Sequence, residues 1–134
     1  MKSKLKKIET GNAPRPIGPY SQGVIAGGFL YCSGQIGINP QTGLLVSGGI
    51  KAETKQVMKN LKNILAEADL DFSDVVRTDI FIRDINDFPQ VNNIYTAFFE
   101  EEITPARQTV EVSNLPKNAL IEISCICLAG EKHD

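Results

Sequence analysis

The chain has 134 residues, of which 42% are hydrophobic and 22% charged, with a formal net charge of −2. This length and composition can bury one ordinary core, so we expect a single domain over residues 1–134. The balanced charge argues against the long-range attraction to phosphate on which non-specific nucleic-acid binding relies. No segment approaches the ~20 apolar residues of a membrane span, and the basic start "MKSKLKK" is not followed by the apolar run of a signal peptide, so a cytoplasmic location is expected.

The N-terminal part predicts an edge strand, a stiff loop and a β-hairpin. A short strand is expected from Leu5 to Glu9. The segment "APRPIGPYSQG" at residues 13–23 contains three prolines. Each proline fixes its own φ angle and restricts the residue before it, so this loop loses few conformations on folding. In "GVIAGGFLYCSGQIGI", Gly27-Gly28 predicts a two-residue hairpin turn, and "NPQTG" at 39–43 predicts another turn.

Two amphipathic helices are expected in the middle of the chain, with a strand between them. From Ile50 to Ala68 the apolar residues follow helical spacing, with polar residues between them. The segment from Val75 to Arg83 is expected to form the strand. The second helix is expected to begin at "DFPQ", where Asp87 is the predicted N-cap, Pro89 lies in the first turn and Gln90 completes a capping box. Its apolar stripe would consist of Val91, Ile94, Tyr95 and Phe98.

Two further strands are expected near residues 106–112 and 120–128, joined by the loop "SNLPKN". The resulting order of elements predicts an α+β fold, with a single sheet of about six strands and both helices packed on one face. The other face would then be free of helices. Because side chains alternate along a strand, Ile126 and Leu128 are expected on this uncovered face, and three copies of the chain packed sheet to sheet around an axis would cover them.

Arg107 and Glu122 are the first candidate site residues. If the last two strands form an antiparallel hairpin, Arg107 lies opposite or diagonal to Glu122 on the uncovered face, while Val110 and Val112 point toward the helices. Such a pair could be an ordinary cross-strand ion pair, which contributes little. It could also be a small-anion site, in which the guanidinium binds a carboxylate and the glutamate carries a proton. The spacing alone leaves both interpretations open.

The cysteines favour buried, reduced thiols over a disulfide framework. Cys32, Cys125 and Cys127 are odd in number and lie among apolar residues. The single histidine, His133, lies in the C-terminal tail. No set of metal ligands with plausible spacing can be assembled from these residues, so no metal site is expected.

Five segments then occur in register along nearly the whole chain: "IGPYSQG", "SGQIG", "DFPQVN.IY..FF", "PAR..VEV..LPK" and "IEI". Together they resemble the reactive intermediate deaminase family, also called Rid, YjgF or endoribonuclease L-PSP-like. The resemblance implies a chorismate-mutase-like α+β fold and a homotrimer. It also implies hydrolysis of enamines and imines that carry a carboxylate (2-aminoacrylate, 2-iminobutanoate and 2-iminopropanoate) to 2-oxo acids and ammonia, with no cofactor.

The resemblance also implies roles for individual residues. Arg107 would clamp the substrate carboxylate, and Glu122 would position and activate water. Thr109 stands where many relatives carry a cysteine, so thiol-based regulation at that position is not expected, although the backbone N–H could still bind ligand. The implied substrate-binding residues are Tyr20, Ser33, Gly34, Asn92 and Thr109. For Tyr20, the resemblance favours a role in the pocket over simple packing.

Two other functions remain as alternatives. One is endoribonuclease or translation-inhibiting activity, which the family name also records. Phosphodiester cleavage commonly uses paired histidines, lysine clusters or metal ions, and His133 stands alone. The other alternative is a non-catalytic trimer that binds small carboxylates or acts as a chaperone.

Overall fold

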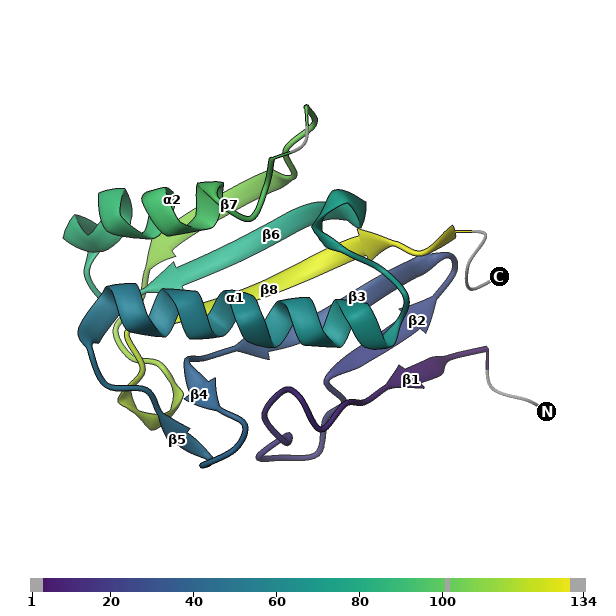
Figure 1. Ribbon diagram of the computed structural model, residues 1–134, viewed down its shortest axis with the longest axis horizontal. Coiled ribbons are helices and arrows are strands. Elements are labelled where there is room, and N and C mark those ends of the chain that lie inside the picture. Colours follow the sequence, from purple (N-terminus) through teal and green to yellow (C-terminus); the bar gives the residue numbers. More distant parts are fainter. Residues whose placement is uncertain (1–3, 101, 131–134) are drawn as a thin grey trace.

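A computed structural model describes residues 4–100 and 102–130, and it confirms the expected α+β architecture. Six strands form one mixed sheet in the order β1-β2-β3-β8-β6-β7. The helices α1 (Gly49–Glu67) and α2 (Phe88–Thr96) both lie over the same face of this sheet (Figure 1). The strands of the sheet are β1 (Lys6–Ile8), β2 (Gly23–Ala26), β3 (Phe29–Gln35), β6 (Val75–Ile82), β7 (Ala106–Glu111) and β8 (Ile121–Leu128).

Some short elements were not predicted. The turn at 39–43 joins β4 (Ile38–Asn39) to β5 (Leu44–Leu45), which form a separate two-stranded sheet. Three single 3₁₀ turns lie at Phe72–Asp74, Ile85–Asp87 and Pro116–Asn118. Strands of two residues carry almost no periodic signal, which is why the sequence indicated only the turn between them.

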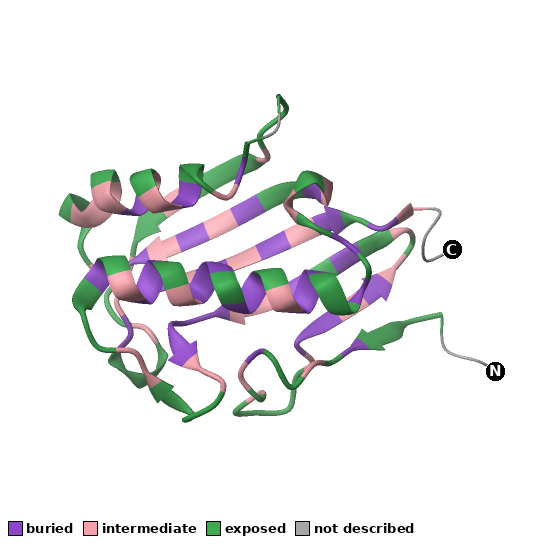
Figure 2. Ribbon diagram, viewed as in Figure 1, coloured by how far each residue is buried: buried purple, intermediate pink, exposed green. Residues whose placement is uncertain are grey.

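The core lies between α1 and the sheet. Figure 2 shows buried residues alternating with less buried ones along the central strands, and one buried stripe along α1. Val57, Leu61 and Ile64 form part of that stripe, and each is less than 2% exposed. Their spacing of four and three residues places them on one face of the helix, as the sequence predicted.

The β2–β3 hairpin confirms the turn predicted at Gly27-Gly28. Both glycines have positive φ angles, 58° and 82°. A two-residue turn of this kind matches the right-handed twist of the flanking strands, and glycine adopts it without a steric penalty.

The predicted capping box at α2 is wrong. Asp87 makes no side-chain capping hydrogen bond, although Pro89 does lie in the first turn. The reason is that a 3₁₀ turn precedes the helix and gives Asp87 helical dihedral angles, with φ −79° and ψ −7°. The preceding 3₁₀ turn does have a capping side chain, that of Asp84, which accepts a hydrogen bond from the N–H of Asn86 at 2.9 Å.

The arrangement of the last two strands also differs from the expectation. β7 and β8 do not form a hairpin: β7 is an edge strand that pairs in parallel with β6, and β8 lies between β3 and β6. Val110 pairs with Phe81 and lies on the face away from the helices, not toward them as predicted. The connection β6–α2–β7 is a crossover through a helix, the usual way to join parallel strands.

Cys32, Cys125 and Cys127 are buried free thiols, as predicted. The sulfur atoms of Cys125 and Cys127 lie 4.0 Å apart on the helix-covered face. His133 lies outside the described residues. Within residues 4–100 and 102–130, no helix is long and apolar enough to cross a membrane.

Candidate functional site

Glu122 and Gly34 lie directly against each other. Glu122 is on β8, in the interior of the sheet, and its side chain lies on the face away from the helices. A Cβ atom built on Gly34 would be 2.6 Å from Oε2 of Glu122 and 2.8 Å from its Cδ. The carboxylate therefore occupies the space that any other side chain at position 34 would need. Burial raises the pKa of Glu122 above its ordinary value, since burial penalises the charged carboxylate.

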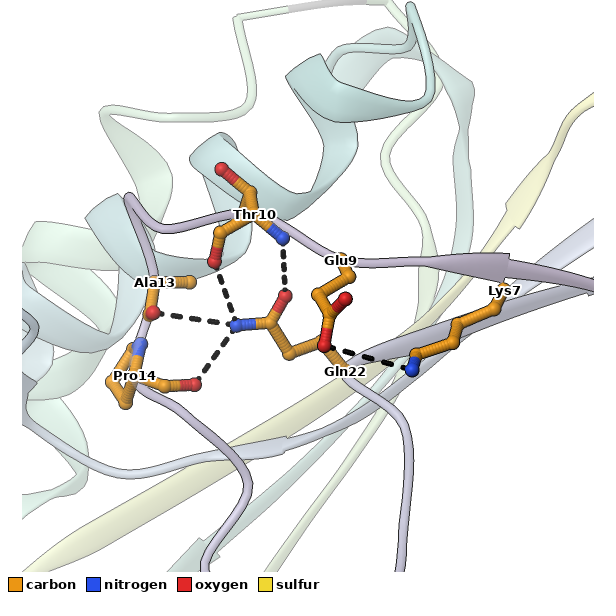
Figure 3. Close-up of polar contacts among 6 residues, drawn as sticks. All are labelled: Lys7, Glu9, Thr10, Ala13, Pro14 and Gln22. Atoms are coloured by element: carbon orange, nitrogen blue, oxygen red, sulfur yellow. Dashed lines mark hydrogen bonds and ion pairs between the residues drawn. The ribbon is translucent and has the colours of Figure 1, made fainter.

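Gln22 fastens the proline-rich loop beside this carboxyl group. It is only 2% exposed. Its side-chain amide donates to the carbonyl oxygens of Thr10 at 3.0 Å, Ala13 at 3.3 Å and Pro14 at 2.9 Å, and its Oε1 accepts from the N–H of Thr10 at 2.7 Å. Figure 3 shows these four contacts converging on one side chain. One buried amide and three prolines thus hold the loop in a single conformation.

Tyr20 lines the hollow beside Glu122, and Ser33 directly precedes Gly34 on β3. The Tyr20 hydroxyl accepts a hydrogen bond from the N–H of Ile17 at 3.3 Å, so the ring folds back over its own loop. Ser33 donates its hydroxyl proton to the carbonyl oxygen of Ser21 at 2.5 Å. Tyr20, Gly34 and Glu122 line one hollow of about 50 Å³. That volume accommodates water beside the carboxyl group.

Asn60 fixes the backbone on another side of the hollow beside Glu122. It is completely buried on α1, and its side-chain amide donates to the carbonyl oxygens of Ile36 at 3.2 Å and Ile38 at 2.9 Å. Ile36 and Ile38 line the same hollow as Glu122. The core helix therefore fixes the backbone on that side of the hollow.

Arg107 lies in a different region, at the edge of the sheet. Its guanidinium carbon is 5.3 Å from the centre of the Phe88 ring and 5.0 Å from the centre of the Tyr95 ring, both on α2. Such contacts orient the guanidinium without using its N–H donors. Tyr95 is itself fixed by a hydrogen bond of 2.8 Å between its hydroxyl and that of Thr78. Among residues 4–100 and 102–130, no carboxylate forms an ion pair with Arg107.

Asn92 and Thr109 belong to the same edge. Phe88, Asn92 and Tyr95 are spaced by four and three residues, so they share one face of α2, the face that contacts Arg107. Thr109 lies two residues after Arg107 on β7 and therefore on the same side of the strand. Its hydroxyl is buried and has no hydrogen-bond partner among the described residues.

The structure thus divides the predicted site residues between two regions. Arg107 pairs with Thr78 of β6, and Thr78 is buried beneath the helices. Glu122 pairs with Phe81, on the opposite face. The expectation that Arg107 and Glu122 meet on one face is wrong, because β7 joins the sheet through β6 and not through β8. We call the region with Arg107, Asn92 and Thr109 the arginine half, and the region with Glu122, Gly34, Ser33 and Tyr20 the glutamate half.

Comparison with known proteins places this geometry in a family. Residues 10–129 match the family described as "Endoribonuclease L-PSP". A solved structure of a conserved Rid family protein, YyfA from Yersinia pestis, superimposes with a TM-score of 0.89 at 52% identity, over 92% of this chain and 98% of that one. The chain belongs to the Rid (endoribonuclease L-PSP) family.

Rid family relatives include proteins with named activities and ligands. The human protein named 2-iminobutanoate/2-iminopropanoate deaminase is 47% identical over 123 residues, which cover 92% of this chain and 89% of the human one. A RutC family protein of Pyrococcus horikoshii is 50% identical over 119 residues, covering 89% of this chain and 94% of its own length. The crystal structure of Escherichia coli TdcF with bound serine matches with a TM-score of 0.87 at 39% identity, over 92% of this chain and 98% of that one.

The supporting residues of this Rid protein were not found from the sequence. Gln22 and Asn60 are polar residues in an otherwise apolar setting, but nothing local distinguishes a buried amide from an exposed one. Phe88 and Tyr95 did have a usable signal, because they share one face of a predicted helix with Asn92. Their contact with Arg107 depends on the crossover that places α2 beside β7.

Proposed function

We propose that this protein hydrolyses reactive 2-imino acids, such as 2-iminobutanoate and 2-iminopropanoate, and the related enamine 2-aminoacrylate, to 2-oxo acids and ammonia. The observation that carries the proposal is Arg107, whose guanidinium is oriented by two aromatic rings and has no carboxylate partner among the described residues. A planar guanidinium with free donors is suited to bind a carboxylate in bidentate fashion. The relatives named as 2-iminobutanoate/2-iminopropanoate deaminases support the same chemistry.

The reaction needs an oriented carbon and a proton carrier. Binding of the substrate carboxylate to Arg107 fixes the position of the adjacent C=N carbon. Water adds to this carbon while Glu122 accepts one of its protons. Glu122 returns that proton to the nitrogen, which gives a carbinolamine, and then moves the proton of the new hydroxyl group to the same nitrogen. The C–N bond breaks as the C–O bond becomes a carbonyl, so ammonia leaves and a 2-oxo acid remains. The raised pKa of Glu122 suits a group that must both accept and donate a proton.

The two halves must be contributed by different copies of the chain, because within one chain they lie on opposite faces of the sheet. The uncovered face offers an apolar surface for such an assembly: Phe29 is 36% exposed, Tyr31 47%, Val110 37% and Leu128 52%. Monomers seldom leave this many apolar groups of one sheet face in water. We propose a homotrimer in which heterologous contacts between sheets close a ring, and the arginine half of each copy faces the glutamate half of its neighbour.

Imine hydrolysis is tested by generating 2-iminobutanoate in situ with a pyridoxal-dependent dehydratase and following release of the 2-oxo acid. The wild-type protein should accelerate hydrolysis over the spontaneous rate. Arg107→Ala should lower kcat/KM by at least about 100-fold, since orientation is most of the catalysis. Lys62→Ala, at an exposed position on α1, is the control and should behave like wild type. Equal rates for Arg107→Ala and wild type would overturn the proposed clamp.

The same preparations separate the alternatives. Cleavage of a structured RNA that persists in Glu122→Ala, after contaminating nuclease is removed, would favour a ribonuclease site elsewhere. Saturable binding of a 2-oxo acid without imine turnover would favour a non-catalytic carboxylate-binding protein. Light scattering gives the assembly directly, and an active monomer would contradict the proposed trimer.

A further inference from the structure

A second hollow adjoins the glutamate half and carries two cations. Its volume is about 420 Å³, and Arg15 and Lys117 both line it, whereas none of its lining residues is acidic. The rest of the lining is apolar or backbone, including Ile17 and Pro40. A concave surface with two positive charges and no negative one attracts an anionic group.

This hollow is continuous with the hollow beside Glu122. Pro14, Arg15, Ile17 and Ile38 line both of them. A small molecule whose reacting carbon lies near Glu122 can therefore extend past Arg15 without leaving the protein surface. The two hollows are neighbouring subsites of one extended groove.

Arg15 and Lys117 form no ion pair within the described residues, and the backbone of each is restricted. Ion pairs among residues 4–100 and 102–130 join Lys7 to Glu9 and Arg77 to Asp79, so neither Arg15 nor Lys117 takes part in one. Arg15 stands between two prolines, which restrict its backbone.

The backbone of Lys117 is also fixed. It has the left-handed φ angle of 56°, which is uncommon for a residue with a side chain. The next residue, Asn118, is held by a hydrogen bond of 2.6 Å from Arg83 to its side-chain oxygen. A residue persists in such a conformation when its neighbours enforce it. The backbone from which the Lys117 side chain projects is thereby fixed at the hollow.

We propose that this cationic hollow binds the distal carboxylate of a 2-imino dicarboxylic acid, so that the protein prefers imines derived from amino acids with acidic side chains. The inference rests on the proposed imine hydrolysis and adds its substrate class. The α-carboxylate would bind Arg107 of a neighbouring copy, while Arg15 and Lys117 take the second carboxylate. An uncharged side chain, as in 2-iminobutanoate, leaves both cations without a partner.

The test compares kcat/KM for 2-iminosuccinate and 2-iminobutanoate, each generated in situ, with the spontaneous rate subtracted. We expect wild type to favour the dicarboxylic imine by about fivefold, as two partly exposed charge pairs can supply. The Arg15→Gln, Lys117→Gln double variant should bring the ratio of the two kcat/KM values close to one. The control Lys62→Gln lies beside a separate hollow near Phe72 and should keep the wild-type ratio.

Calorimetry with the products gives a readout that does not depend on turnover. Oxaloacetate should bind wild type more tightly than 2-oxobutanoate, and the double variant should lose this difference. Turnover of 2-iminobutanoate without any preference for the dicarboxylic imine would overturn the inference while leaving the proposed function intact. Absence of all imine turnover would instead overturn the proposed function, and the binding comparison would then decide whether the anion subsite exists.

Discussion

The glutamate half and the arginine half of the candidate site are built in different ways. Glu122 lies on a central strand, its carboxyl group rests on Gly34, and a loop fastened by Gln22 closes over it. Arg107 lies on an edge strand, most of whose residues are exposed, and it is oriented by the rings of Phe88 and Tyr95. One half is enclosed by hydrogen bonds, and the other is open at the edge of the sheet.

The difference fits the two roles proposed for Glu122 and Arg107. A proton carrier needs a partly buried setting that tunes its pKa, and the interior of a sheet supplies this. A carboxylate clamp needs free N–H donors facing outward, and an edge strand leaves space for them. The edge is also where a neighbouring chain can approach, as the proposed trimer requires. Four predictions test this division, from the largest expected effect to the smallest.

The largest effect is expected from mixing two inactive variants. Arg107→Ala and Glu122→Ala should each abolish imine hydrolysis. When equal amounts are unfolded together and refolded, random assembly makes about three quarters of the trimers mixed, and each mixed trimer has one intact site out of three. About a quarter of the wild-type activity should therefore return. Steady-state rates at equal total protein measure this.

The double variant Arg107→Ala, Glu122→Ala mixed with wild type is the matched control for that experiment. It carries both lesions in one chain, so random mixing with wild type also leaves about a quarter of the sites intact, and mixing it with either single variant restores none. If the two single variants fail to complement each other although mixed trimers form, the two halves do not meet between chains.

Gly34→Ala tests the enclosed half by itself. The added methyl group would lie 2.6 Å from the carboxylate oxygen of Glu122, so the carboxylate must move. A displacement of this size at a proton carrier should lower kcat by roughly 10- to 100-fold, while binding of a 2-oxo acid at Arg107 changes little. Lys62→Ala, at an exposed position on α1, is the control. A fully active Gly34→Ala variant would exclude Glu122 as the proton carrier.

Gln22→Leu tests the loop that closes the glutamate half. The substitution leaves the backbone groups of Thr10, Ala13 and Pro14 without their side-chain partner. Loss of these buried contacts should lower the free energy of unfolding by about 2 kcal/mol and raise KM as the loop loosens. Chemical denaturation and steady-state kinetics measure the two effects. Gln41→Leu, at an exposed turn position, should change neither, and unaltered stability of Gln22→Leu would show that the prolines alone hold the loop.

The smallest effect is expected in the pH dependence of kcat/KM. Glu122 titrates in the working range, whereas Arg107 stays charged. Burial raises the pKa of Glu122 above the ordinary 4.5, and the group must be ionised to accept a proton from water. kcat/KM should therefore rise with pH through an acid limb that lies above 4.5. Arg107→Lys should be slower but keep this limb, whereas residual activity of Glu122→Gln should lack it. An acid limb that survives in Glu122→Gln belongs to another group or to the substrate.

The same raised pKa also predicts how stability depends on pH. The folded state holds the Glu122 proton more tightly than the unfolded chain does. Its contribution to stability is therefore fully present below the unfolded pKa and is lost as the pH rises through the folded pKa. The buried carboxyl group of Glu53 has a pKa shifted in the same direction by burial, so it adds to this trend.

Local pattern was sufficient to predict most of the elements. The glycine pair at 27–28 predicted the hairpin, because a turn with two positive φ angles needs residues that tolerate them. The spacing of Val57, Leu61 and Ile64 predicted the buried face of α1. The α+β class then followed from the order of elements and from the need of each apolar face for a partner. The residue types of the candidate site and their family resemblance could also be recognised from sequence.

Only the tertiary structure decided where the two halves of the site lie. The strands around Arg107 and Glu122 are consecutive in the chain and joined by a short loop, which favours a hairpin. The structure instead pairs β7 in parallel with β6 and inserts β8 between β3 and β6. Local sequence specifies which side chains alternate along a strand, but the partner of that strand depends on how the whole sheet and the helix crossover bury their apolar surfaces. For that reason the sequence could offer Arg107 and Glu122 as candidates but placed them, wrongly, on one face.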